Sequence, residues 1–344
     1  SVIGLEQFNI GHERGSSAHQ SRAFRMAYAE HPGYVPLLKR ARELWLEVNE
    51  GFAKTVFHQT GGLYLSNGDS GFVPDSIAAA KAHDVPHDVL TAEQVRTRFP
   101  VFNIPDEFLG LHEPLAGFIV PEYAIEAHIA IARKHGADLR EGVQVLGWKE
   151  TANGIEVETD QGLVIGDALV ICKGAWTNEI TIRPSRQVLV WFDSPKDAGI
   201  DSPDLPVWAL ELEDSAVLYG FPRMPDLPGP TGFKVARHIA GVTVNPDDED
   251  AKAVIDGDEM DVLPHVQQWL PSAVGNVTAV RTCMYANSPD GHFRIGLHPD
   301  HDKVTIIAGL SGHGFKFQPV IGEIASDLAL NGSCEFDISF LGLK

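Results

Sequence analysis

The chain has few cysteines, a shortage of basic residues and no long hydrophobic run. Three cysteines in 344 residues are too few, and odd in number, for a disulfide framework, which indicates a reducing compartment. The 27 Lys and Arg residues against 47 Asp and Glu residues give a net charge of -20, which disfavours nucleic acid and anionic membranes as partners. No stretch approaches the roughly 18 apolar residues of a membrane span, and the opening SVIGLEQF lacks the regions of a signal peptide. We therefore expect a cytoplasmic protein that binds a small molecule, and we assign no metal site.

Helix and strand patterns alternate along the chain. Apolar residues recur at three and four over residues 34–52, and residues 121–136 open with proline and close with glycine, so both stretches predict helices. Residues 143–166 alternate apolar and polar residues in three strands, and ALVIC at 168–172 predicts a buried strand. The alternation predicts an α/β fold.

Two later segments interrupt this layout. Residues 186–238 are β-rich with turns marked by proline, and residues 247–274 read as helical and acidic. We interpret the acidic run in the second segment as a solvated face. The first segment predicts a β-rich insert.

A glycine-rich turn lies between a strand and a helix near the end of the chain. KVTIIAG predicts a buried strand, GLSGHG at 309–314 a turn, and FKFQPVIGEIASDLAL the helix that follows. Free N–H groups and the helix dipole favour a negatively charged group at such a turn. A tight structural turn explains the glycines equally well, so a second signal is needed.

The second signal is Cys283, in the strand pattern VRTCMYANSPDGHF. A lone strand cysteine is most often a small buried hydrophobe. Together with the downstream SGHGFKF, however, CMY resembles the monomeric sarcosine oxidase family, which includes N-methyltryptophan oxidase and pipecolate oxidase. The resemblance runs the length of the chain and includes these further stretches: ELW, YVPL, GAW, RQV, YGFP, GFK and GEIASDLALNG.

The resemblance implies an FAD cofactor. It implies a covalent bond from the Cys283 sulfur to the flavin ring, and contact of Glu6 with the ribose of the adenosine half. It also implies that the following residues line or flank the cofactor: Ser16, Ser21, Arg22, Val145, Gly174, Ala175, Trp176, Gly312, Gly314, Phe315 and Lys316. Residues 312–315, at the N-terminal end of the helix that follows the glycine turn, would stabilise negative charge on the reduced flavin.

The same resemblance implies the catalytic residues. Arg25 and Lys316 would hold the substrate carboxylate. Lys234 would stabilise superoxide as oxygen is reduced, although alone it reads as a strand lysine whose head reaches solvent. His238 and Tyr285 would adjust the amine and orientation of the substrate. We place substrate preference in the β-rich insert, near residues 208–210.

The implied fold is a discontinuous, Rossmann-like FAD-binding domain of the glutathione reductase type with a second, antiparallel-sheet α+β substrate domain. We place the FAD-binding domain at 1–54, 120–187 and 277–344, and the substrate domain at 55–119 and 188–276. The GxGxxG turn of the family occurs nowhere in this chain. We therefore expect an N-terminal strand and phosphate turn to be missing, and FAD binding by this chain to be weak.

The leading interpretation is oxidation of an N-methyl or cyclic amino acid to an imine, with reduction of O2 to H2O2 by a monomer. A second is a dehydrogenase of the same superfamily that passes electrons to another acceptor. A third is a non-catalytic homologue that keeps a carboxylate pocket but has lost the flavin. Lys234 favours oxygen as the acceptor.

Overall fold

A computed structural model describes residues 1–69, 71–239 and 241–343. The α-helices are α1 (Tyr34–Gly51), α2 (Phe72–Ala82), α3 (Ala92–Arg98), α4 (Pro121–Lys134), α5 (Leu263–Trp269) and α6 (Gln318–Asn331). The short 3-10 helices are η1 (Gly174–Trp176), η2 (Asp258–Asp261), η3 (Pro271–Ala273), η4 (Phe315–Phe317) and η5 (Ser339–Leu341). The strands are β1 (Ile3–Glu6), β2 (Arg22–Phe24), β3 (Phe57–His58), β4 (Gly62–Asn67), β5 (Asp88–Thr91), β6 (Phe108–Glu113), β7 (Gly117–Ile119), β8 (Asp138–Glu141), β9 (Val145–Thr151), β10 (Gly154–Thr159), β11 (Gly162–Gly166), β12 (Leu169–Ile171), β13 (Arg183–Asp193), β14 (Val207–Glu211), β15 (Val217–Gly220), β16 (Phe233–His238), β17 (Asn276–Asn287), β18 (Arg294–His298) and β19 (His301–Ala308).

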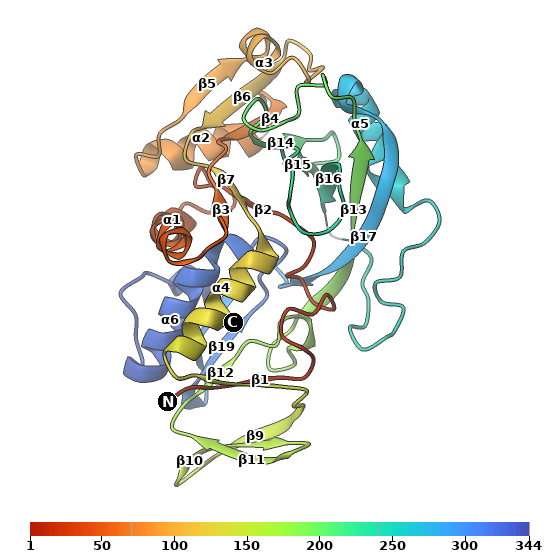
Figure 1. The fold of residues 1–344 in the computed structure, drawn as a ribbon. Helices are drawn as coiled ribbons and strands as arrows, with labels where there is room; N and C mark the ends of the chain where they lie inside the picture. The colour runs from red at the N-terminus through yellow and green to blue at the C-terminus, as the bar shows by residue number, and fades with distance from the viewer. Residues whose placement is uncertain (70, 240, 344) are drawn as a thin grey trace.

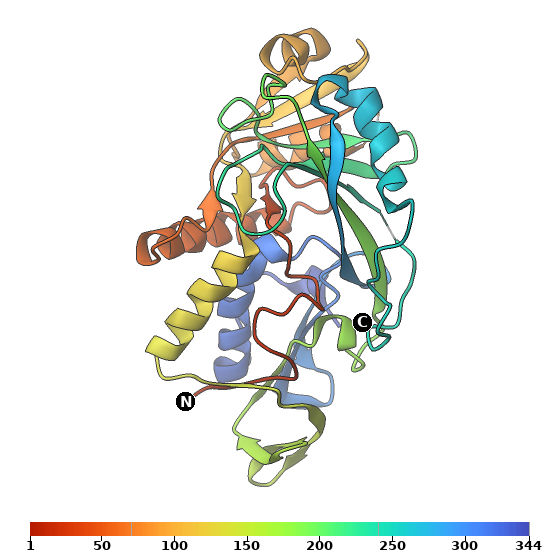
Figure 2. The same ribbon diagram turned by 45° about the vertical axis from the view of Figure 1, so that its right-hand side comes forward.

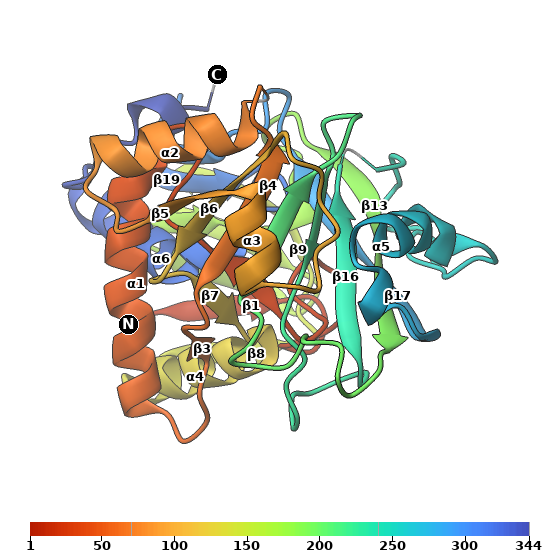
Figure 3. The same ribbon diagram turned by 90° about the horizontal axis from the view of Figure 1, so that it is seen from above.

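An eight-stranded sheet forms the upper part of the molecule, with strand order β17-β13-β16-β15-β14-β4-β6-β5 (Figure 1). All its neighbours are antiparallel except β14 and β4. Seen from above, α2 and α3 lie over the β4–β6 end of this sheet, and α5 lies beside β17 at the other end (Figure 3). The long β13–β17 ladder reaches down toward the rest of the molecule.

Parallel pairs lie in the lower part. β1 pairs with β8, and β12 pairs with β19, which also pairs antiparallel with β18. Helices α4 and α6 pack beside these strands with α1 above them, and the β9–β10–β11 meander projects below (Figures 1 and 2). Parallel strands with crossover helices are the arrangement typical of dinucleotide-binding folds.

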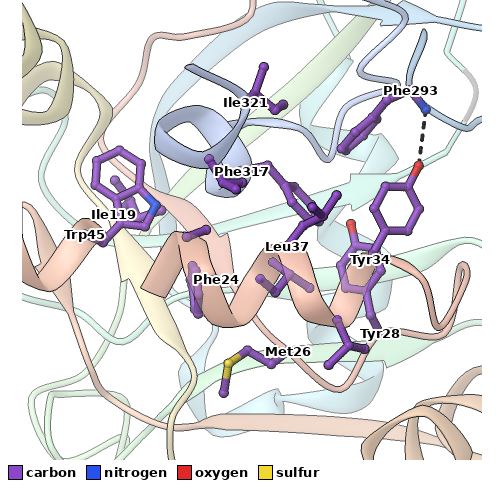
Figure 4. Packing of buried hydrophobic residues seen from close by; sticks show 14 of the residues in the cluster. Phe24, Met26, Tyr28, Tyr34, Leu37, Trp45, Ile119, Phe293, Phe317 and Ile321 are labelled. Carbon is purple, nitrogen blue, oxygen red and sulfur yellow. Dashed lines mark hydrogen bonds between the residues drawn. The ribbon is translucent and has the colours of Figure 1, made fainter. Parts of the chain in front are cut away.

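A hydrophobic core joins α1, α6 and the aromatic residues around them (Figure 4). The indole of Trp45, fully buried on α1, donates to the backbone carbonyl of Lys316 at 2.8 Å. Tyr34, at the start of α1, packs against Phe293, and the Phe293 N–H donates to the Tyr34 hydroxyl at 3.2 Å. The first contact fixes η4 against α1, and the second fixes the segment before β18 against the start of α1.

Several predicted elements are confirmed. α1 and α4 occupy the predicted ranges, and Pro121 begins α4. The three-strand meander turns at Gly154 and Gly162, which have φ of 119° and 120°. Such positive φ values favour glycine.

Two predictions were wrong in part. Between residues 247 and 274 helix is confined to η2, α5 and η3, because residues 247–257 form turns with backbone bonds three residues apart. ALVIC is only half buried: Val170 is 37% exposed, because side chains alternate across β12 and one of its faces is uncovered. Within the residues that the structure describes, no helix is long and apolar enough to cross a bilayer.

Candidate flavin and substrate site

Three strand ends meet at one edge of the lower sheets. Glu6 ends β1, the Gly174–Trp176 turn follows β12, and the glycine turn follows β19, which is parallel to β12. The Glu6 carboxylate accepts from the Phe8 N–H at 2.9 Å and lies 3.6 Å from His12. Ligands in open α/β sheets bind beyond the carboxyl ends of the strands, where a terminal acid can hold a ribose.

Other predicted cofactor contacts lie around this edge. Val145 is 39% exposed and begins β9, two residues after Val143, whose N–H donates to the Glu6 carbonyl at 2.9 Å. Trp176 donates its indole N–H to Asp247 at 2.8 Å. Gly174 has φ of 57°, and a Cβ there would meet no atom within 4 Å. This edge therefore has open space beside Gly174, where no side chain covers the backbone.

The strand register places the predicted catalytic residues of β16 and β17, together with the predicted flavin-attachment cysteine, on one face of the large sheet. Trp191 is paired with Lys234, and Gln187 is paired with Cys283. Because side chains alternate along each strand, Lys234 and His238 on β16 share this face with Cys283 and Tyr285 on β17. The opposite face is packed apolar core.

The same alternation corrects the predicted specificity region. Trp208 and Leu210 point into the apolar core and are at most 1% exposed. Ala209 is paired with Tyr219 and lies on the face that carries Lys234. Only the middle residue of the predicted three therefore faces the candidate site.

The glycine turn packs on the end of β17. Gly312 has φ of 78°, and a Cβ added there would lie 2.3 Å from the Tyr285 ring. The Ser311 N–H donates to the Ala286 carbonyl at 3.0 Å. Gly314 precedes η4, where Phe315 stacks near Trp45 with ring centroids 6.4 Å apart. The two sequence signals, GLSGHG and CMY, are thus in direct contact.

Lys234 is buried rather than solvent-facing. Its ammonium donates to the carbonyls of His19 and Ser21 at 2.6 and 3.1 Å and to the Ser21 hydroxyl at 3.2 Å. Burial, followed by the charge of Arg22, lowers the pKa of Lys234 well below its usual range. The alternative of a solvated strand lysine is excluded by its 2% exposure.

Arg22 and Cys283 complete this side of the site. The guanidinium of Arg22 donates to the carbonyl of Ser16 at 2.7 Å and to that of Ser21 at 2.9 Å. Burial raises the pKa of the Cys283 thiol, and the charges of Arg22, Lys234 and Lys252 oppose that rise. The thiol therefore lies in an apolar cluster next to several cations.

Lys316 and Arg25 form a second cationic group. Lys316, 5% exposed, donates to the His313 carbonyl at 2.7 Å and contacts the Tyr28 hydroxyl at 3.4 Å. Burial, followed by the charge of Arg25, lowers the pKa of Lys316 to about 7. Arg25 lies over the Tyr28 ring, 4.3 Å from its centroid, and pairs with the carboxylate of Glu30.

Glu30 responds to all of these cations. Burial alone would raise the pKa of its carboxyl, but the charges of Arg25 and Lys316 contribute to lowering that pKa to about 2. The side chain of Glu30 is 28% exposed. The charges of Arg25 and Lys316 therefore favour a carboxylate, here that of Glu30, in the space between them.

The histidines near this point are neutral. Burial lowers the pKa of His313 to about 3 and that of His238 to about 4. His313 Nε2 lies 3.0 Å from the Gly291 carbonyl and must donate to it, so Nδ1 accepts from the Tyr28 hydroxyl at 2.7 Å. Tyr28 oxygen is then free to accept from Lys316. His238 Nδ1 lies 3.2 Å from the Tyr285 hydroxyl.

Sequence reasoning missed three of these side chains. Tyr28 and Glu30 follow Arg25 closely, but nothing in their spacing distinguishes them from any loop residues. His313 lies inside the SGHGFKF stretch and could have been singled out there. The burial and ring contacts of Tyr28, fully buried between Arg25 and Phe317, arise only from the fold.

The residues present fit the flavin ring and the adenosine ribose of FAD. Acid, glycine turns and open space meet at the strand ends, and buried cations converge on the adjoining sheet face beside Cys283. A model of the FAD dependent oxidoreductase family, DAO, matches residues 1–328. The chain belongs to this family of FAD-dependent oxidoreductases.

The chain is also similar to particular members. It is 38% identical to the monomeric sarcosine oxidase of Streptomyces avermitilis, over 96% of this chain and 88% of that protein. It is 32% identical to the N-methyl-L-tryptophan oxidase of Salmonella typhimurium, over 95% and 88% of the two chains. The open form of NikD, an amino acid oxidase of nikkomycin biosynthesis, matches the fold with a TM-score of 0.83 at 22% identity, over 100% of this chain and 91% of that one.

Proposed function

We propose that the protein oxidises a secondary amino acid, N-methyl or cyclic, to an imine, and that oxygen is reduced to hydrogen peroxide. FAD, when bound, would supply the chemistry that takes up a hydride equivalent, two electrons and one proton, from the carbon beside the amine and passes the two electrons to oxygen, while the amine nitrogen loses its own proton. The observation that carries the proposal is the pair formed by buried Lys316 and partly buried Arg25, close to Tyr285 and His238, in a chain similar to sarcosine oxidases.

The cation pair supplies the carboxylate site. Two of the three N–H groups of Lys316 have protein partners, which leaves one for a ligand among the described residues. Glu30 pairs with Arg25, so a substrate carboxylate competes with Glu30 for the guanidinium. A carboxylate held by both cations fixes the position of the amine relative to the sheet face.

His238 and Tyr285 would contact the amine end of the substrate. A neutral imidazole accepts a hydrogen bond without adding positive charge beside the amine, which suits oxidation of the unprotonated amine. Lys234 would act on oxygen, because a fixed buried cation stabilises developing superoxide charge. Cys283 would hold the flavin covalently, with the remaining predicted cofactor residues around it.

Several broader assignments belong to the same proposal. They are the division into FAD-binding and substrate domains at the predicted boundaries, a monomeric state and a cytoplasmic location. The β13–β17 ladder crosses the boundary we place between residues 187 and 188, so the two domains share a continuous pair of strands.

The proposal is tested by assaying peroxide release from a panel of amino acids with the FAD-loaded protein. Sarcosine, N-methyl-tryptophan, proline and pipecolate should include at least one good substrate, whereas their N-acetyl counterparts should give none because they lack a basic amine. Oxidation that requires an artificial electron acceptor, with no peroxide, would identify a dehydrogenase instead. Absence of both bound flavin and turnover would favour the non-catalytic alternative.

Carboxylate binding should weaken as pH rises above about 7. Lys316 has a pKa lowered to about 7, so the ammonium form that binds a carboxylate predominates below that pH and is lost above it. Above this point affinity for acetate, read from the flavin spectrum, should fall toward about tenfold per pH unit. Lys316→Met should bind acetate weakly and with little pH dependence, whereas a wild-type affinity that is flat over the same range would contradict the assignment.

A further inference from the structure

Residues 19–21 form a strained turn that includes Ser21 and directly precedes Arg22, two of the predicted flavin-lining residues. His19 and Gln20 both have left-handed backbone conformations, with φ of 77° and 71°, although neither is glycine or asparagine. The Ser21 N–H donates to the His19 carbonyl at 2.9 Å, two residues back. An i to i+2 bond around a central residue with positive φ is the rare and strained form of γ-turn. Such strain persists only where the surroundings determine the conformation.

Glu122 holds one side of this turn. Its Oε1 accepts from the N–H groups of both His19 and Gln20, at 2.9 and 3.0 Å. Glu122 follows Pro121 in the first turn of α4, where the helix dipole favours a negative charge. Its Oε2 is buried without a hydrogen-bond partner among the described residues. The N–H groups of two adjacent residues, His19 and Gln20, therefore point to the same carboxylate oxygen of Glu122.

Lys234 holds the other side. Its ammonium donates to the carbonyls of His19 and Ser21 and to the Ser21 hydroxyl, which accounts for all three of its N–H groups. The turn thus lies between an acid on α4 and a cation on β16. The position of the ammonium is set by where the turn places these oxygens.

Three further contacts, made by the side chains of His19 and Gln20, tie the turn to the large sheet and to the loop before β16. The Gln20 side chain accepts from the buried indole of Trp191 at 2.7 Å and donates to the Pro230 carbonyl at 2.9 Å. His19 Nε2 lies 3.0 Å from the carbonyl of Thr282, the residue before Cys283. A shift of the turn would therefore be transmitted to the strand that carries the thiol.

We propose that Glu122 is a positioning residue for Lys234. By fixing the left-handed turn at 19–21, Glu122 holds the Lys234 ammonium at one point on its face of the large sheet, where we assign the reaction with oxygen. Among the described residues no hydrogen bond or ion pair joins Glu122 to Lys234, so Glu122 acts on the position of the ammonium through the two amides. The negative charge of Glu122 also opposes the lowering of the Lys234 pKa. The inference rests on the proposed function only in assigning Lys234 to the reaction with oxygen. The local effect of Glu122 on the turn is measurable without turnover.

Three variants test the proposal. Glu122→Ala removes the acceptor, and Glu122→Gln keeps an oxygen that can accept from both amides. Glu126→Ala is the matched control, because Glu126 lies one helical turn later on α4 and pairs at the surface with Lys54 at 2.6 Å. Thermal unfolding identifies any variant that fails to fold.

The first measurement is hydrogen–deuterium exchange of the peptide that spans residues 16–25, in the protein as purified. Loss of two amide bonds should speed exchange by about tenfold or more in Glu122→Ala, while Glu122→Gln and Glu126→Ala should resemble wild type. Unchanged exchange in Glu122→Ala would overturn the proposal, and so would exchange in Glu122→Gln as fast as in Glu122→Ala.

The second measurement separates the half-reactions of the FAD-loaded protein by stopped flow. Glu122→Ala should slow reoxidation by oxygen at least about tenfold and leave reduction by substrate close to wild type, with Glu122→Gln restoring most of the loss. Equal slowing of both half-reactions would show a general structural role and overturn the proposal. If Glu122→Ala is reoxidised at the wild-type rate while Lys234→Met is slow, the positioning role of Glu122 is overturned. If both variants are reoxidised at the wild-type rate, the function proposed for Lys234 is overturned.

Discussion

Replacing Cys283 with alanine is expected to release all flavin from the protein on acid precipitation, whereas wild type should keep it. Cys283 is 3% exposed and packs with Leu189, Trp191 and Ala236, so the smaller alanine fits the same strand position. What is lost is the sulfur, which forms the proposed bond to the flavin ring. The measurement is flavin fluorescence of the precipitated and washed protein.

The other two cysteines provide the control. Cys172 and Cys334 lie outside the Cys283 cluster, and their alanine variants should retain as much acid-stable flavin as wild type. Acid-stable flavin in Cys283→Ala, or its loss in Cys172→Ala, would show that the attachment site is elsewhere. The cations around Cys283 favour a thiolate against the effect of burial, so attachment should also slow in Arg22→Ala.

Lys234→Met should slow reoxidation of the reduced protein by about 10²- to 10³-fold, the usual effect of removing one preorganised electrostatic group. Methionine keeps the length and apolar contacts of the side chain but removes the charge beside Trp191 and Phe221. Substrate reduction should change little, since the substrate carboxylate is assigned to Lys316 and Arg25. Stopped-flow measurement of each half-reaction separates the two.

Lys149 offers a matched control for this variant. It is an exposed lysine, 71% accessible, in a surface ion pair with Glu156 on the meander. Lys149→Met should leave both half-reactions unchanged. A similar loss in the reductive and oxidative steps of Lys234→Met would place this lysine on the substrate side and contradict the assignment.

Elements with strong local patterns were predictable from the sequence. The helix at α1 follows from its apolar periodicity. The Thr91 cap of α3 is also local, because the Thr91 side chain accepts from the Gln94 N–H three residues later. The resemblance implied that GLSGHG and CMY both lie at the flavin, but their direct contact was not predicted. No local pattern specifies that Gly312 must lie against the Tyr285 ring.

Features that depend on distant partners were not predictable. Lys234 reads as an exposed strand lysine until the 19–21 turn covers it with carbonyls from a segment more than 200 residues earlier. Positive φ at His19 and Gln20 contradicts their local preferences and is imposed by Glu122. Residues 247–257 resemble a helix in composition, but Asp258 and Arg186 tie the segment to the sheet as turns.

The most direct test of the account is anaerobic mixing of the FAD-loaded protein with an N-methyl amino acid while the visible absorption of oxidised flavin is followed. The account predicts complete bleaching with one equivalent of imine formed, return of the absorption when oxygen is admitted, and no bleaching by the N-acetyl counterpart. A flavin spectrum that stays oxidised with every secondary amino acid tested would contradict the proposed function, whatever the state of the covalent bond to Cys283.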